Sequence, residues 1–235
     1  MSNFVDQQYI KSFFKDKRVA IIGSAPSCLD NKGSDINAYD IVVRVNNYKI
    51  QGFEDRVGNR TDVFYSFYGS SIKKSREELI KDGVKLCMCK CADADCHTTN
   101  WHKKHGKEKG GNFGWIYRAR QNFWFCDTYI PTREQYMKFF DLLGGHVPTT
   151  GFASILEILE TEAKEIYVTG FTFFEPMSKG APVIHNITDS WKTDKNIDDP
   201  VRHLPNLEKK ILKDYYLSGK YPLEVDSKIK ELFGV

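Results

Sequence analysis

The sequence predicts an α/β protein in which a largely parallel sheet carries helices on both faces. Short apolar runs rich in β-branched residues alternate along the chain with stretches of helical periodicity. Strands separated by helices favour parallel pairing, because each helix returns the chain to the start of the next strand. The 235 residues contain no internal repeat and no Pro/Gly-rich linker, and a chain of this length can bury one sizeable core. We therefore expect a single Rossmann-like domain over residues 1–235.

Apolar runs mark the predicted strands. The first run ends at Gly23, and a glycine directly after a buried strand indicates a tight turn. The predicted strands are Arg18–Ile22, Asp40–Val45, Thr61–Phe67, Val84–Cys89 and Glu165–Thr169. Ligands of open parallel sheets bind beyond the carboxyl ends of the strands. We expect the functional residues in the loops that follow these runs.

Capping signals and helical periodicity mark the predicted helices. Thr132 is suited to cap a helix that the glycine at 144 then stops. The predicted helices are Ser70–Lys81, Thr132–Leu143, Gly151–Glu162, Asn206–Leu217 and Leu223–Leu232.

The composition is that of an ordinary soluble protein. The net charge of +3 is too small to indicate a nucleic-acid partner by itself, and 41% of the residues are apolar. A membrane span needs about 18 consecutive apolar residues, and the sequence has no such run. The first 18 residues are polar and charged, unlike a signal peptide. We therefore expect a cytoplasmic protein, in a bacterium or in a virus-infected host cell.

Four of the six cysteines, Cys87, Cys89, Cys91 and Cys96, stand close together and are followed by histidines. Zinc motifs use these residue types, usually as Cys-x2-Cys on a turn. Here the cysteines of the predicted strand recur every second residue, which places small thiols on one face of a strand. The alternation favours structural thiols, although zinc binding remains an alternative.

The loop Gly23, Ser24, Ala25, Pro26 and Ser27 is the first candidate binding segment. Glycine lets the backbone approach a phosphate closely, and serine offers hydroxyl donors. The loop has neither G-x-G-x-x-G nor a P-loop lysine, which disfavours a dinucleotide dehydrogenase and an NTPase. Taken alone, it is more typical of a tight turn than of a site.

Thr149, Thr150 and Gly151 form the second candidate segment, at the start of a predicted helix. The backbone N–H groups and the dipole of a helix N-terminus favour a phosphate or carboxylate there. The alternative is a threonine that only caps the helix.

Two C-terminal histidines are candidate catalytic residues. His203 precedes Glu208 in a His-x4-Glu pattern, and His185 lies further upstream. An imidazole suits a general base because its pKa lies near neutral. A lone histidine is more often an ordinary surface or core residue.

In this order the segments resemble the sialyl motifs of glycosyltransferase family 29. Val19–Asn31, Asp40–Asn46 and Val57–Thr61 are similar to the family's long motif. Pro148–Gly151 with the helix and strand behind it is similar to the short motif, and His203-x4-Glu208 to the very short motif. Bacterial sialyltransferases of family 42 share the Gly-x-x-Pro-Ser loop and are a close second.

The resemblance implies the sialyltransferase variant of the GT-A fold and an inverting transfer that needs no metal or cofactor. The donor would be a CMP-linked or related pyrimidine-nucleotide sugar of the sialic-acid type, and the acceptor a hydroxyl of a glycan or glycolipid. His203, favoured over His185, would be the base, and Asn46 would contact the nucleotide together with the glycine loop and Thr149–Gly151. Asp93-Ala94-Asp95 matches the metal-binding Asp-x-Asp of other glycosyltransferases, and a metal role for it is the minority alternative.

The resemblance leaves the middle of the chain unexplained, and we expect a lid or acceptor-binding insertion at about 92–130. Basic and aromatic side chains gather there: Trp101, Lys103, Lys104, Trp115, Arg118 and Arg120. A basic lid suits an anionic donor. The same residue types suit nucleic acid, so an enzyme that adds a sugar such as arabinose to a hydroxymethylated base in DNA is an alternative. A nucleotide-binding module without catalysis is a third possibility.

Overall fold

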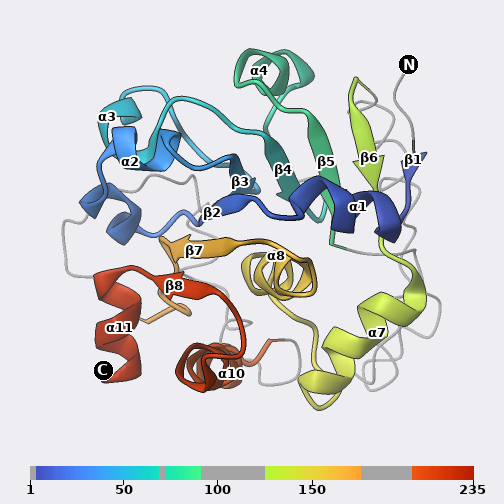
Figure 1. Cartoon of the computed structure of the whole chain (residues 1–235), viewed down its shortest axis with the longest axis vertical. Helices are drawn as coiled ribbons and strands as arrows, with labels where there is room; N and C mark the ends of the chain where they lie inside the picture. The colour runs from blue at the N-terminus through green and yellow to red at the C-terminus, as the bar shows by residue number, and fades with distance from the viewer. Residues whose placement is uncertain (1–3, 69–71, 91–124, 176–202) are drawn as a thin grey trace.

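The computed structural model describes residues 4–68, 72–90, 125–175 and 203–235. All described strands belong to one eight-stranded sheet in the order β1-β6-β5-β4-β3-β2-β7-β8 (Figure 1). Every neighbouring pair is parallel, so the predicted α/β architecture is confirmed. The strands are β1 Phe4–Val5, β2 Arg18–Ile22, β3 Ile41–Val45, β4 Val63–Ser66, β5 Leu86–Cys89, β6 Asp127–Tyr129, β7 Glu165–Thr169 and β8 Leu223–Val225.

Helices cover both faces of the sheet, as the sequence predicts (Figure 1). One face carries α1 Gln7–Phe14, α7 Arg133–Leu142, α8 Thr150–Leu159, α10 Pro205–Ser218 and α11 Ser227–Phe233. The other carries the 3-10 turn η1 Pro26–Asp30, α2 Gly33–Asn37, α3 Glu54–Val57 and α4 Arg76–Lys81. Successive side chains of each central strand point alternately into these two cores. Both faces of the strand are buried, so nearly all of its residues are apolar.

Capping side chains decide where several helices begin. The Thr132 hydroxyl accepts from the Gln135 N–H, and the Gln135 side-chain oxygen accepts from the Thr132 N–H. This capping box confirms the predicted start of α7. Ser75 and Glu78 form the same capping box at α4. The helix predicted from Ser70 therefore begins only at Arg76, after that cap.

One helix prediction was wrong. Leu223–Leu232 is predicted as a single helix, but the structure divides it into β8 and α11. Asp226 causes the division, because its carboxylate accepts from the Ile229 N–H at 2.7 Å and so caps a helix that starts at Ser227. Leu223 and Val225 are buried with an exposed residue between them, in the two-residue period of a strand.

Helix α8 lies between the sheet and the outer helices, and every residue from Phe152 to Leu159 is buried. Its one internal acid, Glu157, accepts a hydrogen bond from the Tyr65 hydroxyl of β4 at 3.0 Å. Burial raises the pKa of Glu157 to about 8, so this carboxyl is largely protonated at neutral pH. The helix is thus fixed to the sheet by apolar packing and by a buried polar contact.

The order of the strands reverses between β2 and β7. From β2 the chain moves outward through β3, β4, β5 and β6, and it then returns to the other side of β2 as β7. Such a switch point opens a crevice at the carboxyl ends of the two strands. Gly23 directly follows β2 and Gly170 directly follows β7, and a Cβ on Gly23 would lie 2.2 Å from the Gly170 carbonyl oxygen.

We predict that Gly170→Ala destabilises the protein by at least about 2 kcal/mol. Gly170 has φ +77°, and its added Cβ would lie 2.8 Å from the Cys28 Cβ and 2.9 Å from the Gly23 oxygen. Gly219→Ala is the matched control, because Gly219 has φ +62° with nothing within 4 Å of the new Cβ. Measured by urea unfolding, the free energy of unfolding of Gly219→Ala should fall by only about 1 kcal/mol. Equal losses in the two variants would contradict the steric contact.

Candidate active site at the carboxyl edge of the sheet

The glycine loop after β2 is held against the end of β7 by backbone hydrogen bonds. The Gly23 N–H donates to the Thr169 carbonyl at 2.8 Å, and the Ala25 N–H donates to the Gly170 carbonyl at 2.9 Å. Pro26 then begins η1, in which Ser27 is 9% exposed. The Ser27 Oγ is buried without a hydrogen-bond partner among the described residues. Because a buried hydroxyl without a partner is costly, this atom is suited to a ligand.

The start of α8 packs against the same crevice. Thr149 is its N-cap, and its hydroxyl accepts from the Phe152 N–H at 3.2 Å. The Phe171 ring lies between this helix start and the glycine loop, since a Cβ on Gly151 would lie 2.5 Å from that ring and one on Gly23 3.0 Å from it. Three glycines, at 23, 151 and 170, therefore let three backbone segments meet around one aromatic side chain.

Glu208 connects the start of α10 to the start of α8. Its two carboxylate oxygens accept the Thr149 N–H at 2.7 Å and the Thr149 hydroxyl at 2.8 Å. Glu208 is 1% exposed, and burial raises its pKa to about 7, while the bonds from Thr149 and the charge of Lys90 act in the opposite direction. Lys90, itself 5% exposed, directly follows β5. Thr149 is thus occupied as a cap and as the partner of Glu208.

His203 lies beside the chain that leads into α8. Its Nδ1 is 2.7 Å from the Val147 carbonyl oxygen. A carbonyl only accepts, so Nδ1 carries the proton, and Nε2 of the neutral ring is unprotonated. This tautomer is the form that a general base needs. Leu204 and Pro205 then lead directly from His203 into α10, which Glu208 anchors.

Asp226 fixes the end of β7 from the other side. One of its carboxylate oxygens accepts the Thr169 hydroxyl at 2.8 Å and the Gly170 N–H at 2.9 Å. The Asn31 side-chain amide donates to the hydroxyl oxygen of Thr169 at 3.0 Å and to the Cys28 carbonyl at 2.8 Å. The end of β7 and the turn after the glycine loop are therefore parts of one hydrogen-bonded unit.

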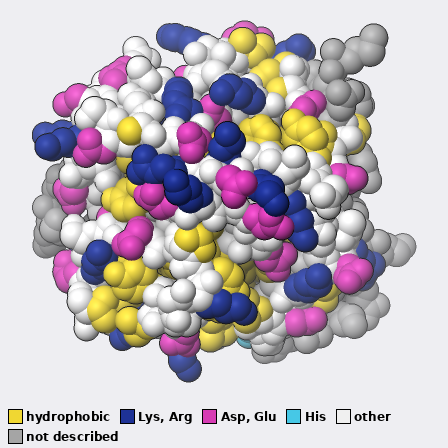
Figure 2. All heavy atoms as spheres, viewed as in Figure 1, with side chains coloured by type: hydrophobic (Ala, Val, Ile, Leu, Met, Phe, Trp, Pro, Cys, Tyr) yellow, Lys and Arg dark blue, Asp and Glu magenta, His cyan; other side chains and the backbone are white. Residues whose placement is uncertain are grey.

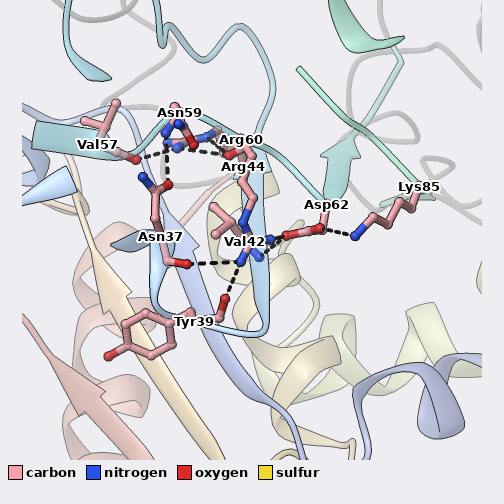
Figure 3. Close-up of polar contacts among 9 residues, drawn as sticks. All are labelled: Asn37, Tyr39, Val42, Arg44, Val57, Asn59, Arg60, Asp62 and Lys85. Carbon is pink, nitrogen blue, oxygen red and sulfur yellow. Dashed lines mark hydrogen bonds and ion pairs between the residues drawn. The ribbon is translucent and has the colours of Figure 1, made fainter. Parts of the chain in front are cut away.

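Asn46 and Arg44 occupy the end of β3. Asn46 has φ +52°, and its side-chain oxygen accepts the Ser66 hydroxyl at 3.3 Å, which orients the amide. Arg44 is 1% exposed, and burial lowers its pKa to about 10. Its guanidinium donates to the carbonyls of Val57 and Arg60, as Figure 3 shows. Arg44 thus braces the loop between α3 and β4.

Asp62 completes this network (Figure 3). Its carboxylate accepts the Val42 N–H at 2.9 Å and pairs with Arg60 and, at 2.8 Å, with Lys85. Because Asp62 is 2% exposed, its charge needs these partners. The Val57–Thr61 segment, which resembles part of the long motif, therefore supports the ends of β3 and β4 structurally.

The structure brings the glycine loop, Asn46, Thr149–Gly151 and His203 to the carboxyl edge of one sheet. The other predicted site residues lie outside the described residues: His185, Trp101, Lys103, Lys104, Trp115, Arg118 and Arg120. Sequence reasoning missed Phe171, Lys90 and Asp226. The aromatic residue after Gly170 was a visible signal for Phe171. No local pattern marks Lys90 as buried, or Asp226 as the partner of Thr169 and Gly170, which lie 57 and 56 positions away.

The described part of the cysteine cluster agrees with the prediction of structural thiols, because Cys87 and Cys89 are both buried in β5 and pack in the same core. Within the described ranges, no three Cys, His, Asp or Glu residues are placed to hold a metal ion. Cys91, Cys96, Asp93 and Asp95 lie outside those ranges. Cys87 instead contacts Cys126, which is remote in sequence, with the two Sγ atoms 3.4 Å apart.

Neither positive nor negative charge dominates the face of the molecule that Figure 2 shows. Figure 2 shows Lys and Arg interspersed with Asp and Glu, with apolar side chains between them. No helix in the described part of the chain is long and apolar enough to cross a membrane.

We predict that Glu208→Gln changes how stability depends on pH. The folded-state pKa of Glu208 is raised from 4.5 to about 7, so the folded state keeps a proton that the unfolded chain loses. The contribution of Glu208 to stability is therefore full at low pH and falls as the pH rises from about 4.5 to 7, by about 3 kcal/mol in total. The difference in unfolding free energy between the native protein and Glu208→Gln should therefore change by about 3 kcal/mol across this pH range. A constant difference between them would contradict a raised pKa.

Comparisons with known proteins agree with this geometry. The family model described as glycosyltransferase family 29 (sialyltransferase) matches residues 15–219. A comparison with curated protein sequences gave no significant match. A mammalian sialyltransferase has a similar structure with TM-score 0.58 and 17% identity, and the match covers 94% of this chain and 73% of that one.

Two sialyltransferases of Campylobacter jejuni are also similar in structure. CstII, in complex with the substrate analogue CMP-3FNeuAc, has TM-score 0.55 and 16% identity, and the match covers 89% of this chain and 81% of that one. The monofunctional alpha-2,3-sialyltransferase Cst-I has TM-score 0.59 and 12% identity, and covers 98% and 81%. These likenesses confirm the sialyltransferase fold. Since the family model spans most of the chain, this protein belongs to glycosyltransferase family 29 and is a glycosyltransferase.

Proposed function

We propose that this protein transfers a sugar of the sialic-acid type from a CMP-linked donor to a hydroxyl group of a glycan. The observation that carries the proposal is the pairing of His203, held in the tautomer of a base, with a helix start and a glycine loop suited to an anion. Relatives of the same fold were crystallised with CMP and with CMP-3FNeuAc. One mammalian sialyltransferase of the same fold was crystallised in complex with Gal-beta-1-3GalNAc-ortho-nitrophenol.

In this proposal the nucleotide lies over the switch point between β2 and β7. The buried Ser27 hydroxyl and the N–H groups of Thr150 and Gly151 would donate to the phosphate. Asn46, oriented by Ser66, would contact the nucleotide beside them. Thr149 would act indirectly, because its own hydroxyl is bound to Glu208.

His203 would be the general base of a single displacement. Its Nε2 takes the proton from the acceptor hydroxyl while that oxygen attacks the anomeric carbon, and CMP leaves from the opposite face, so the configuration inverts. The Val147 carbonyl stabilises the imidazolium that forms, because Nδ1–H keeps donating to it. The negative charge on the departing phosphate would meet backbone N–H groups and hydroxyls rather than a metal.

The acceptor is the least constrained part of the proposal. A glycan hydroxyl is supported by the complex of the mammalian sialyltransferase with Gal-beta-1-3GalNAc-ortho-nitrophenol, which carries sugar hydroxyls. The relatives reported above are sialyltransferases, so they give a DNA acceptor no support.

We predict that His203→Ala lowers the turnover number by a factor of about 10² to 10⁴. Binding of CMP should change less than about threefold, because the glycine loop and the α8 start are left intact. His146→Ala is the control histidine, one residue before Val147, and should keep most of the activity. Turnover is measured as CMP release with Gal-beta-1-3GalNAc as acceptor. Unchanged turnover in His203→Ala would exclude His203 as the base.

We predict that cytidine nucleotides protect the protein against thermal unfolding more than uridine or guanosine nucleotides do. Ligand that binds only the folded state stabilises it by about 2.7 kcal/mol at a hundred times its Kd. CMP, UMP, GMP and CMP-sialic acid are compared at equal concentration, with and without EDTA. A shift with GMP alone, or one that EDTA abolishes, would contradict the proposed donor or the metal-free site.

A further inference from the structure

Cys87 and Cys126 form a thiol pair that the sequence does not reveal. Their Sγ atoms lie 3.4 Å apart, although 39 positions separate the two residues in the chain. Cys87 belongs to β5, and Cys126 directly precedes β6, its neighbour in the sheet. The register pairs Cys87 with Thr128, so Cys126 is two residues before that partner and faces the same side.

The surroundings make the two thiols unequal. Cys87 is 0% exposed and packs in the core under α4, whereas Cys126 lies half-buried at the border of that core. Contact with Cys126 and burial both hold the pKa of Cys87 well above its usual range. A reagent in solvent therefore reaches Cys126 first. Because the raised pKa keeps Cys87 mostly protonated, its attack on Cys126 is the slower second step.

We propose that Cys87 and Cys126 are a redox modification site, which a low-molecular-weight disulfide such as oxidised glutathione converts into a reversible disulfide. The Cys126 thiolate attacks one sulfur of the reagent, forms a mixed disulfide and releases the first glutathione thiolate. The Cys87 thiolate then attacks the Cys126 Sγ and displaces the second. In total the protein loses two protons and two electrons, and the reagent is reduced to two thiols.

The two sulfur atoms are already close to each other. A disulfide has an S–S distance of about 2.05 Å, so the sulfurs approach by roughly 1.4 Å from their present separation. Cys28, by contrast, is buried behind the glycine loop, where its β-carbon faces Gly170. Cys89 shares the face of Cys87 but lies two residues further along β5. Among the described cysteines, the Sγ–Sγ contact of 3.4 Å joins Cys87 to Cys126.

The bond would close the chain between residues 87 and 126 into a covalent loop. Closing a loop of that length restricts the unfolded chain and stabilises the folded one. The proposal is independent of the sugar transfer, since neither cysteine belongs to the carboxyl-edge site.

The test uses the whole protein in glutathione buffers of stepwise higher oxidised fraction. Samples are quenched in acid, alkylated and digested with trypsin without reduction. Trypsin should release Leu86–Lys90, which contains Cys87 and Cys89, and Gln121–Arg133, whose one cysteine is Cys126. We expect these two peptides joined, with a mass two hydrogens below their sum, and separated again by dithiothreitol.

Single variants assign the bond and provide the controls. Cys89→Ala should still give the joined peptides, now necessarily through Cys87. Cys87→Ala should leave glutathione attached to Cys126, and Cys126→Ala should abolish the joined pair. In the native chain, oxidation should raise the thermal unfolding midpoint by roughly 5 °C or more.

Two results would overturn the proposal. One is that the joined peptides are absent at every oxidised fraction in the native chain, a measurement that does not depend on any variant folding. The other is that they persist in Cys87→Ala or vanish in Cys89→Ala, which would assign the bond to Cys89.

Discussion

The contact between the backbones of Gly23 and Gly170 is the constraint on which the rest of the site depends. It sets how closely β2 and β7 approach at their carboxyl ends, where the order of the sheet reverses. Phe171 follows directly and fills the space between the glycine loop and Gly151. Any side chain at position 23 or 170 would separate these segments, and the groups suited to a nucleotide would no longer face one crevice.

A second layer of contacts places the candidate base relative to that crevice. Glu208 anchors α10 to the start of α8, and His203 reaches back from the beginning of α10 to the Val147 carbonyl. The spacing of five positions between the histidine and the glutamate therefore has a physical meaning. His203 is the proposed base, and Glu208 ties the helix that follows it to the start of α8, so the position of each residue depends on the other.

Much of the fold could be predicted from the sequence, because long apolar runs and capping residues are local signals. β2, β7 and the Thr132 cap illustrate this. The edge strands β1, β6 and β8 have only two or three residues, too few to show a period. In the site, the order of the glycine loop, Asn46 and His203 was visible in the sequence. Partnerships such as Glu208 with Thr149 were not, because they join positions 59 residues apart.

Arg44 has a further consequence, for the response of this edge of the sheet to ionic strength. Its guanidinium is 1% exposed and donates to backbone carbonyls. Burial raises the pKa of Cys28 in the turn behind the glycine loop to about 12, and the positive charge of Arg44 acts in the opposite direction. Dissolved ions screen exposed charges within about 8 Å at physiological salt, but they screen a buried charge much less. An anion attracted to this crevice would therefore feel a field that added salt hardly weakens, unlike one held by surface lysines.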